Sequence, residues 1–149
     1  MVRFVVSVVL LLATIMFSIV IENGNPLSYL GPTAFMVELL VPLFAMLAVW
    51  RLVEIGRAFR DAFSEKDDAA SRTRSARIWD FAEKVCYAAA VMAFLLGAVL
   101  ILSRPISSEA PLGPAFAAAT VGPLYGIVFA IISRILKARV EQKAARRDG

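Results

Sequence analysis

The most unusual chemical group of this chain is Glu38, an acid inside the apolar run 32–50. A charge at the centre of a bilayer costs about 2.5–3.5 kcal/mol on insertion scales, so acids in such runs are often functional. Glu38 lies about two turns from one end of the run, where this cost falls. We weigh two hypotheses: Glu38 contacts an ion or another subunit, or it is an interfacial or bundle-facing residue with a hydrogen-bond partner.

A second group of candidates lies in the stretch "ATVGPLYG", residues 119–126. Thr120 could coordinate an ion or a partner's acid, or its hydroxyl could bond to a carbonyl of its own helix. Gly122, Pro123 and Gly126 are poor choices for a helix in water. In a membrane, neighbouring helices compensate for such residues. The stretch therefore predicts a membrane helix, with a kink at Pro123.

Other chemistry finds little support in the sequence. The chain has no histidine, the commonest catalytic base and metal ligand, and it lacks nucleotide-binding and hydrolase motifs. The single cysteine, Cys86, is expected to be a small buried apolar residue. We expect no enzymatic activity, no cofactor and no metal site. The basic residues flank apolar runs and are mixed with acids, so we expect lipid contact rather than nucleic-acid binding.

The elements that position these residues follow from composition. Apolar residues make up 60% of the chain, mean hydropathy is +0.75 and charged residues make up 19%. Four nearly charge-free runs have the length that a helix needs to cross a bilayer. They predict an all-α integral membrane protein, a single domain over residues 1–149, with transmembrane helices at 4–21, 32–50, 85–103 and 114–133.

The distribution of Lys and Arg predicts the orientation of these helices. Fifteen of the sixteen basic residues lie before the first run, in the connector 51–84 or in the tail 134–149, and only Arg104 lies in the other two loops. This bias places both termini in the cytoplasm. A signal peptide is the alternative for the first run. That run exceeds the usual 7–15 apolar residues, however, and "SIVIENG" offers no small-residue cleavage site.

The connector 51–84 is expected to have three parts. In "WRLVEIGRAFRDAF", residues 50–63, apolar residues recur at helical spacing, so the second membrane helix is predicted to continue as an amphipathic helix. Its apolar positions are Leu52, Ile55, Phe59 and Phe63. Residues 64–75 predict a flexible turn, and residues 76–84 resume the helix, with Asp80 and Lys84 one turn apart. Trp50 and Trp79 are expected in an interfacial aromatic belt.

Small residues form stripes on the last two predicted helices. Helices approach closely in a membrane where small residues face each other. The stripes are either the contact between these two helices, or one of them faces a partner helix or an identical subunit. Their members are Ala89, Ala93 and Gly97 in the third helix, and Ala118, Gly122, Gly126 and Ala130 in the fourth.

The stretch "GPLYGIVFAIISRILKARVEQ" resembles the fourth helix of the MotA/TolQ/ExbB family, in which an aromatic-glycine pair, here Tyr125-Gly126, precedes a basic extension. The N-terminal stretch from "IENGNP" to "FRDAF" resembles the family's first outer loop and second helix. The resemblance implies four spans and a pentameric ring in the bacterial inner membrane. It also implies a single-span partner that carries an intramembrane Asp, and proton or sodium passage between that partner and the last two spans.

This chain departs from the family's pattern in three ways. The connector's 34 residues stand where family members of the stator type have a large cytoplasmic domain, so the chain would be a reduced member. The family's threonine beside the aromatic-glycine pair is replaced by Gly122 and Pro123, with Thr120 one turn earlier. The proline and Gly-Thr pattern of the family's third span is missing from "VCYAAAVMAFLLGAVLILS". The sequence hypothesis is therefore a ring-forming subunit of an ion-driven motor or force-transducing complex, and the alternative is a membrane scaffold or small transport protein without ion coupling.

Overall fold

The computed structural model describes residues 2–21, 32–63, 69–102 and 112–145, and these residues form five helices. The helices are α1 (Val2–Ile21), α2 (Pro32–Val49), α3 (Leu52–Phe63), α4 (Ala69–Leu102) and α5 (Leu112–Ala145). The predicted all-α class is thus confirmed for the part of the chain that the structure describes.

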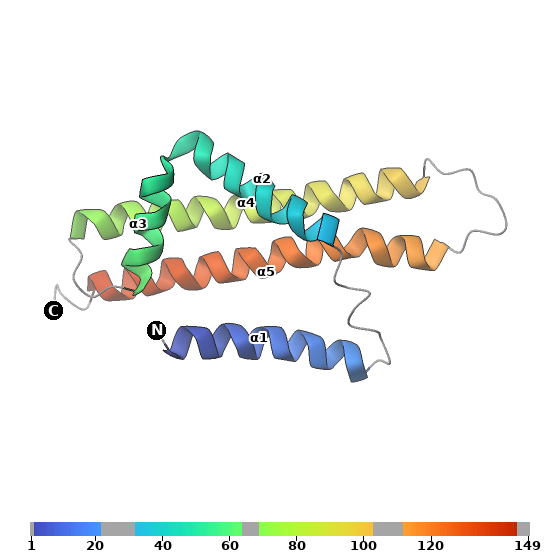
Figure 1. The fold of residues 1–149 in the computed structure, drawn as a ribbon, viewed down its shortest axis with the longest axis horizontal. Coiled ribbons are helices and arrows are strands. Elements are labelled where there is room, and N and C mark those ends of the chain that lie inside the picture. The colour runs from blue at the N-terminus through green and yellow to red at the C-terminus, as the bar shows by residue number, and fades with distance from the viewer. Residues whose placement is uncertain (1, 22–31, 64–68, 103–111, 146–149) are drawn as a thin grey trace.

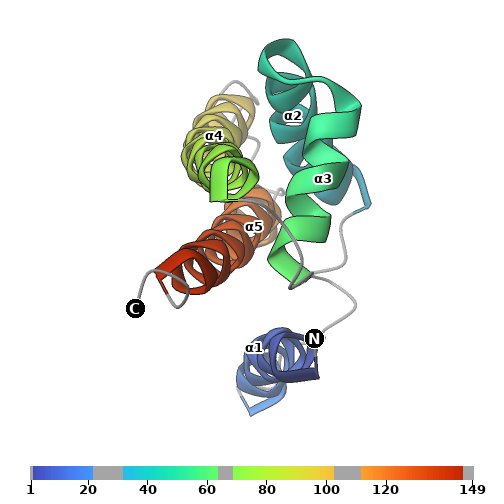
Figure 2. The same ribbon diagram turned by 90° about the vertical axis from the view of Figure 1, so that its left-hand side faces the viewer.

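The two long helices α4 and α5 form the centre of the molecule. Each has 34 residues, and they run antiparallel, side by side along most of their length (Figure 1). Helices α2 and α3 cover one side of this pair, and α1 lies apart from it (Figure 2). A pair of helices this long can carry a site deep inside the bundle while its ends reach beyond an apolar layer.

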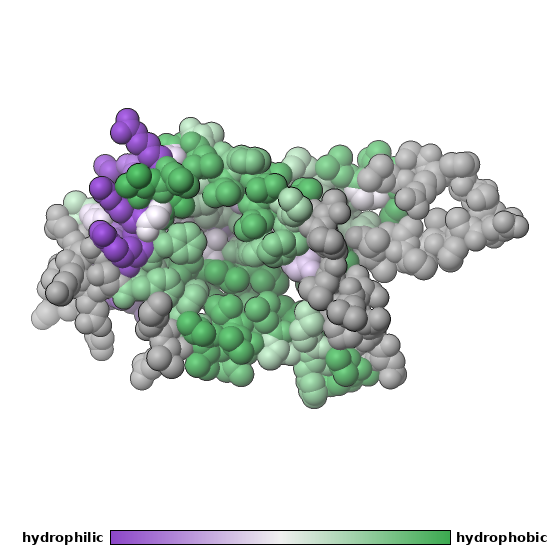
Figure 3. All heavy atoms as spheres, viewed as in Figure 1, coloured by the Kyte–Doolittle hydropathy of each residue, from purple (hydrophilic) through white to green (hydrophobic). Residues whose placement is uncertain are grey.

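Among the described residues, α4 and α5 are long and apolar enough to cross a membrane, and α2 with α3 counts as a third span if the bent pair is taken together. Helix α1 adds a shorter apolar helix over Phe4–Phe17. Hydrophilic residues gather at the end of the molecule where α3 lies, whereas most of the remaining visible face is hydrophobic (Figure 3). We call the end around α3 the charged end. These features support a membrane protein with at least two spans.

The prediction that the second membrane helix continues straight into residues 50–63 is wrong. Helix α2 ends at Val49, α3 begins at Leu52, and the two are bent by 109°. At the corner, the Glu54 carboxylate accepts a hydrogen bond from the Arg51 N–H (3.1 Å), and the Glu54 N–H donates one to the Arg51 carbonyl (2.8 Å). This reciprocal pair starts a new helix at the point where the sequence pattern suggested a continuous one.

The predicted flexible turn over 64–75 is wrong from residue 69 onwards. Helix α4 begins at Ala69 and runs through 76–84 into the apolar segment without a break, while residues 64–68 lie outside the described part. Polar residues in the first turns of α4 are held by α3: Asp61 accepts hydrogen bonds from Ser71 (2.8 Å) and Ser75 (2.6 Å). These tertiary hydrogen bonds stabilise a helix that the polar sequence alone did not indicate.

The core lies at the charged end, where α3 crosses α4 and α5. The buried side of α3 consists of Ile55, Ala58, Asp61 and Ala62, whereas Leu52 and Phe59 remain 67% and 47% exposed. The amphipathic helix was therefore predicted correctly, and its apolar face in part: Ile55 is buried and Phe63 packs on the core, whereas Ala58 and Ala62 take the places expected for larger side chains. The other buried apolar members of this cluster are Met46, Ile78, Trp79, Ala82, Leu136 and Val140.

Trp79 is not part of an interfacial aromatic belt as predicted. Its side chain is 3% exposed, packs edge-on against Phe59 (4.5 Å between ring centroids) and donates a hydrogen bond to the Ala58 carbonyl (3.3 Å). The indole therefore joins α3 to α4 inside the core. Its amphipathic character serves the protein interior rather than the membrane surface.

Helix α1 contacts the other helices at its beginning. The Phe4 ring meets the Phe63 ring of α3 edge-on (5.2 Å between centroids), and the Arg139 guanidinium of α5 lies 5.3 Å from the centroids of both rings. Most of the described α1 side chains are exposed or half-buried. This helix is held at its first turn and leaves an apolar surface along its length.

A candidate ion site: a buried carboxyl group where three helices meet

Glu38 lies in the interior of the bundle, at the contact of α2 with α4 and α5. Its side chain is fully buried (0% exposed), and neither carboxyl oxygen has a hydrogen-bond partner among the described residues. The residue is therefore bundle-facing, as one of the sequence hypotheses had it, but without the expected hydrogen-bond partner. Burying an unpartnered hydrogen-bonding group costs about 1–3 kcal/mol, so this position is expensive for the fold.

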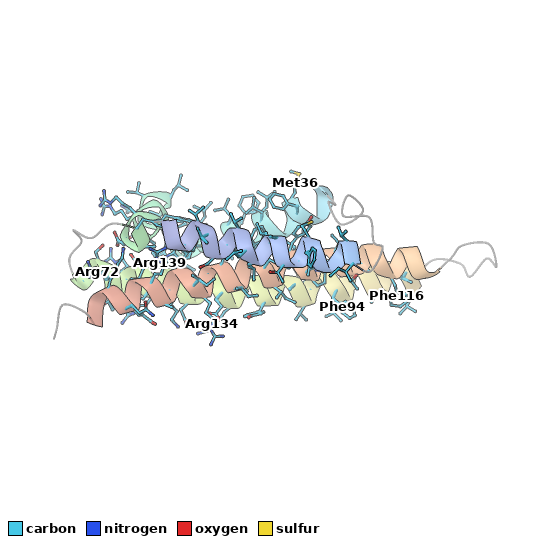
Figure 4. The ribbon with its side chains drawn as sticks, turned by 90° about the horizontal axis from the view of Figure 1, so that it is seen from below. Met36, Arg72, Phe94, Phe116, Arg134 and Arg139 are labelled. Atoms are coloured by element: carbon cyan, nitrogen blue, oxygen red, sulfur yellow. The ribbon has the colours of Figure 1, made fainter. Side chains whose placement is uncertain are left out.

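The helical periodicity of α2 explains why Glu38 points inward. Glu38, Pro42 and Met46 follow at intervals of one turn, and all three are buried. The opposite side of α2 is apolar and exposed, as the outward-pointing Met36 shows (Figure 4). Because a single stripe of α2 faces the bundle, the acid cannot turn to solvent without rotating the whole helix.

Two glycines of α5 make room for the Glu38 carboxyl group. A Cβ atom on Gly126 would lie 2.6 Å from Glu38 Oε2, and a Cβ atom on Gly122 would lie 3.6 Å from Oε1. The first distance is below any real contact of a Cβ atom, whereas the second is ordinary van der Waals contact. Gly126 is thus the closest approach of α5 to the end of the Glu38 side chain.

The same glycines pack against α4. A Cβ atom on Gly126 would lie 2.7 Å from the Cβ of Ala90, and one on Gly122 would lie 3.3 Å from the Cβ of Ala93. One turn further along, a Cβ atom on Gly97 would lie 2.7 Å from the Cβ of Ala119. We call this row of contacts the α4–α5 seam. It shows that stripe residues of the two helices face each other within one chain.

The remaining members of the predicted stripes are placed as follows. Ala89 and Ala130 are buried, with Ala130 fully inaccessible. The side chain of Ala118 lies outside the part that the structure describes. The pairing of Gly126 with Ala90 and of Gly97 with Ala119 was missed, because neither alanine belongs to the stripes chosen from sequence spacing. A signal was present in "CYAAA", where small residues occupy every position from 88 to 90.

The other ion-path candidates do not join Glu38 in the same way. Thr120 is exposed, and Pro123 and Tyr125 are half-buried. The Tyr125 ring meets Phe35 of α2 edge-on, with 5.6 Å between ring centroids. Tyr125 therefore belongs to the contact between α2 and α5, next to Gly126 in sequence but about 100° further around α5. Helix α5 runs through Pro123 as one element.

Between the carboxyl group and the charged end, the α4–α5 seam holds one further polar pair. The buried Cys86 thiol interacts with the Ser133 hydroxyl and lies within electrostatic range of Glu38. The prediction that Cys86 is buried is confirmed. The sequence did not indicate the contact of Ser133 with Cys86, because Ser133 is simply the last residue of an apolar run.

Ion pairs between α4 and α5 follow beyond this pair. Lys137 Nζ lies 2.6 Å from Asp80 Oδ1, and Lys84 Nζ lies 2.7 Å from Asp80 Oδ2, which confirms the predicted pairing one turn apart. Arg134 lies 3.5 Å from Glu83 and points away from the bundle (Figure 4). The charged groups thus begin within one turn of Cys86 and Ser133.

The chemistry available at Glu38 is narrow. The described residues contain no group of three or more Cys, Asp or Glu side chains that could hold a metal ion. The carboxyl group lies against Gly122 and Gly126, which have no side-chain ligand to offer. A neutral carboxylic acid fits such surroundings far better than an ionised one.

Comparison with protein-family models, with curated proteins and with solved structures gives no match for this chain.

Proposed function

We propose that this chain is a membrane subunit of an ion-driven motor or force-transducing complex, similar to the MotA/TolQ/ExbB family but without the large cytoplasmic domain. It would have four spans, with α1 as the first and both termini in the cytoplasm, and would assemble as a ring, a pentamer by the resemblance, in the bacterial inner membrane. A partner with a single span and an intramembrane Asp would occupy the ring.

One observation carries this proposal: the Glu38 carboxyl group is fully buried in an apolar helical bundle, with no hydrogen-bond partner among the described residues. Ionisable groups inside membrane segments are rare because they are costly, and they commonly mark ion pathways. A protein that served only as a scaffold would be more stable with an apolar residue at this position. The retained acid therefore favours an ion-coupled function over the scaffold alternative.

The apolar outer surface agrees with assembly. Phe94 of α4 and Phe116 of α5 point outward, as does Met36 of α2 (Figure 4). These side chains can face lipid or a neighbouring copy. Because the small residues of the α4–α5 seam are engaged within the chain, a ring would use these large apolar side chains and α1 for its subunit contacts.

Two measurements test the proposal. Native mass spectrometry of gently extracted protein is expected to give five copies, with or without a small companion. Proton or sodium flux into vesicles that contain the chain and its companion is expected to exceed the flux in empty vesicles. A monomer without flux would contradict the proposal and support the scaffold alternative.

A further inference from the structure

We propose that Glu38 is a proton-binding site that this chain itself contributes, and that the site accepts a proton but no metal cation. The inference rests on the proposed function and deepens it, since it names the ion and the group that holds it. In the mechanism implied by the resemblance, the essential protonatable aspartate belongs to the partner. Here a second acid would lie in α2, against Gly122 and Gly126 of α5.

Burial and missing partners together require the neutral form. Both carboxyl oxygens are inaccessible and have no hydrogen-bond donor among the described residues. No basic side chain forms an ion pair with Glu38 in the described part of the chain; the ion pairs of α4 and α5 lie at the charged end. An ionised carboxylate without a counter-charge in such surroundings takes up a proton instead.

Donor chemistry excludes a metal cation. A hard cation needs several oxygen ligands around it, whereas the residues of α5 that lie against the carboxyl group are Gly122 and Gly126, which pack in turn on Ala93 and Ala90 of α4. These residues offer no side-chain oxygen. The Cys86 thiol lies within electrostatic range of Glu38, and a thiol is a soft and weak ligand for such ions. A proton needs no ligand shell, so it fits where sodium does not.

The position of the carboxyl group also couples proton binding at Glu38 to the contact between α2 and α5. Gly126 leaves space for Glu38 Oε2 that any side chain would fill, so the neutral acid lies directly against the α5 backbone. Ionisation requires water or a cation at this point, and neither fits while α2 stays in contact with α5. Release of the proton therefore requires α2 to separate from the α4–α5 seam.

Infrared spectroscopy of the full-length protein in lipid vesicles tests the site directly. The C=O stretch of a protonated carboxyl group is separate from the bands of ionised carboxylates and amides. We expect this band at neutral pH in the wild type and its loss in Glu38→Gln, which keeps the shape of the side chain. The matched control is Glu141→Gln, on the exposed side of α5, which should leave the band unchanged.

Each outcome decides the proposal. Absence of the band in the wild type, or its persistence in Glu38→Gln, would overturn it. Loss of the band on addition of excess sodium to sodium-free vesicles would overturn the restriction to protons. If Glu38→Gln fails to give folded protein, Glu38→Met, an apolar residue of similar length, provides the same comparison.

Flux measurements on the same vesicles separate this inference from the proposed function. If the infrared band is present but there is no proton flux, Glu38 binds a proton but the ion-driven function is refuted. If the flux is unchanged in Glu38→Gln, the ion-driven function stands but Glu38 is not part of the proton pathway. We expect both the band and the flux to be lost in Glu38→Gln, with at least a tenfold reduction of flux.

Discussion

The α4–α5 seam predicts that Gly126→Ala destabilises the protein, whereas Gly122→Ala does not. At Gly126 the new methyl group would lie 2.7 Å from the Ala90 Cβ and 3.1 Å from its Cα. Carbon atoms in ordinary contact are about 3.5–4.0 Å apart, so the helices must separate locally by roughly 1 Å. Glu38 is also 2.6 Å away, but its end can move, whereas the α4 backbone cannot.

The magnitude follows from two opposing effects. Overpacking of a close contact costs about 1–3 kcal/mol, and alanine in place of glycine inside a helix gains about 1 kcal/mol. Gly126→Ala should therefore lose up to about 2 kcal/mol of unfolding free energy. Gly122→Ala needs a shift of only a few tenths of an ångström from Ala93, so the gain in helix propensity compensates for it. Gly56→Ala, with nothing within 4 Å, should be more stable than the wild type.

Thermal unfolding in detergent, followed by circular dichroism, measures this order. For a chain of this length 1 kcal/mol corresponds to about 2–4 °C. Ala90→Gly should partly rescue Gly126→Ala, because it removes the methyl group that the new Cβ meets. If Gly126→Ala melts at or above the temperature of Gly122→Ala, or if Ala90→Gly rescues nothing, the close contact of the seam is refuted.

Three further predictions concern the charged end. Asp61→Ala removes the acceptor of two serine hydroxyls of α4 and should lower the unfolding free energy by about 1–3 kcal/mol; Arg74→Ala, which breaks the exposed ion pair with Glu54, should change it by less than 1 kcal/mol. Equal losses in the two variants would contradict this account. Trp79→Phe should cost about 1 kcal/mol in denaturant unfolding through the lost hydrogen bond to α3, and no loss would mean that burial of the ring suffices. A double-mutant cycle of Phe4→Ala and Phe63→Ala should give a coupling of about 0.5–1.5 kcal/mol, and a coupling near zero would show that α1 is not held there.

Sequence reasoning was most successful where composition decides the outcome. Apolar runs of bilayer length predicted helices, and the apolar core of each observed long helix lies where a run was expected. Glu38 was chosen as a candidate because an acid in an apolar run is costly wherever its side chain points. These inferences depend on the solvent preferences of residues, which are properties of the sequence itself.

The missed features depend on contacts between distant segments. The corner at Arg51 contains neither glycine nor proline, and it depends on a hydrogen bond to Glu54 that competes with a continuous helix. The start of α4 depends on Asp61 in another helix. Likewise, spacing identified Gly126 as a packing residue, but its contact with Glu38 requires the position of α2 on the α4–α5 pair.

The corner between α2 and α3 also gives the protein a built-in optical reporter. Both tryptophans of the chain lie there: Trp50 is at the corner itself, 4.9 Å from the Phe81 ring centroid, and Trp79 is beneath α3. Glu38 of α2 precedes Trp50 by twelve residues, about 18 Å at the rise of a helix. A displacement of α2 at the acid would shift Trp50 against Phe81 while Trp79 stays fixed by its hydrogen bond. Tryptophan emission can thus follow movement of α2 in the unlabelled protein, with a Trp79→Phe variant isolating the signal of Trp50.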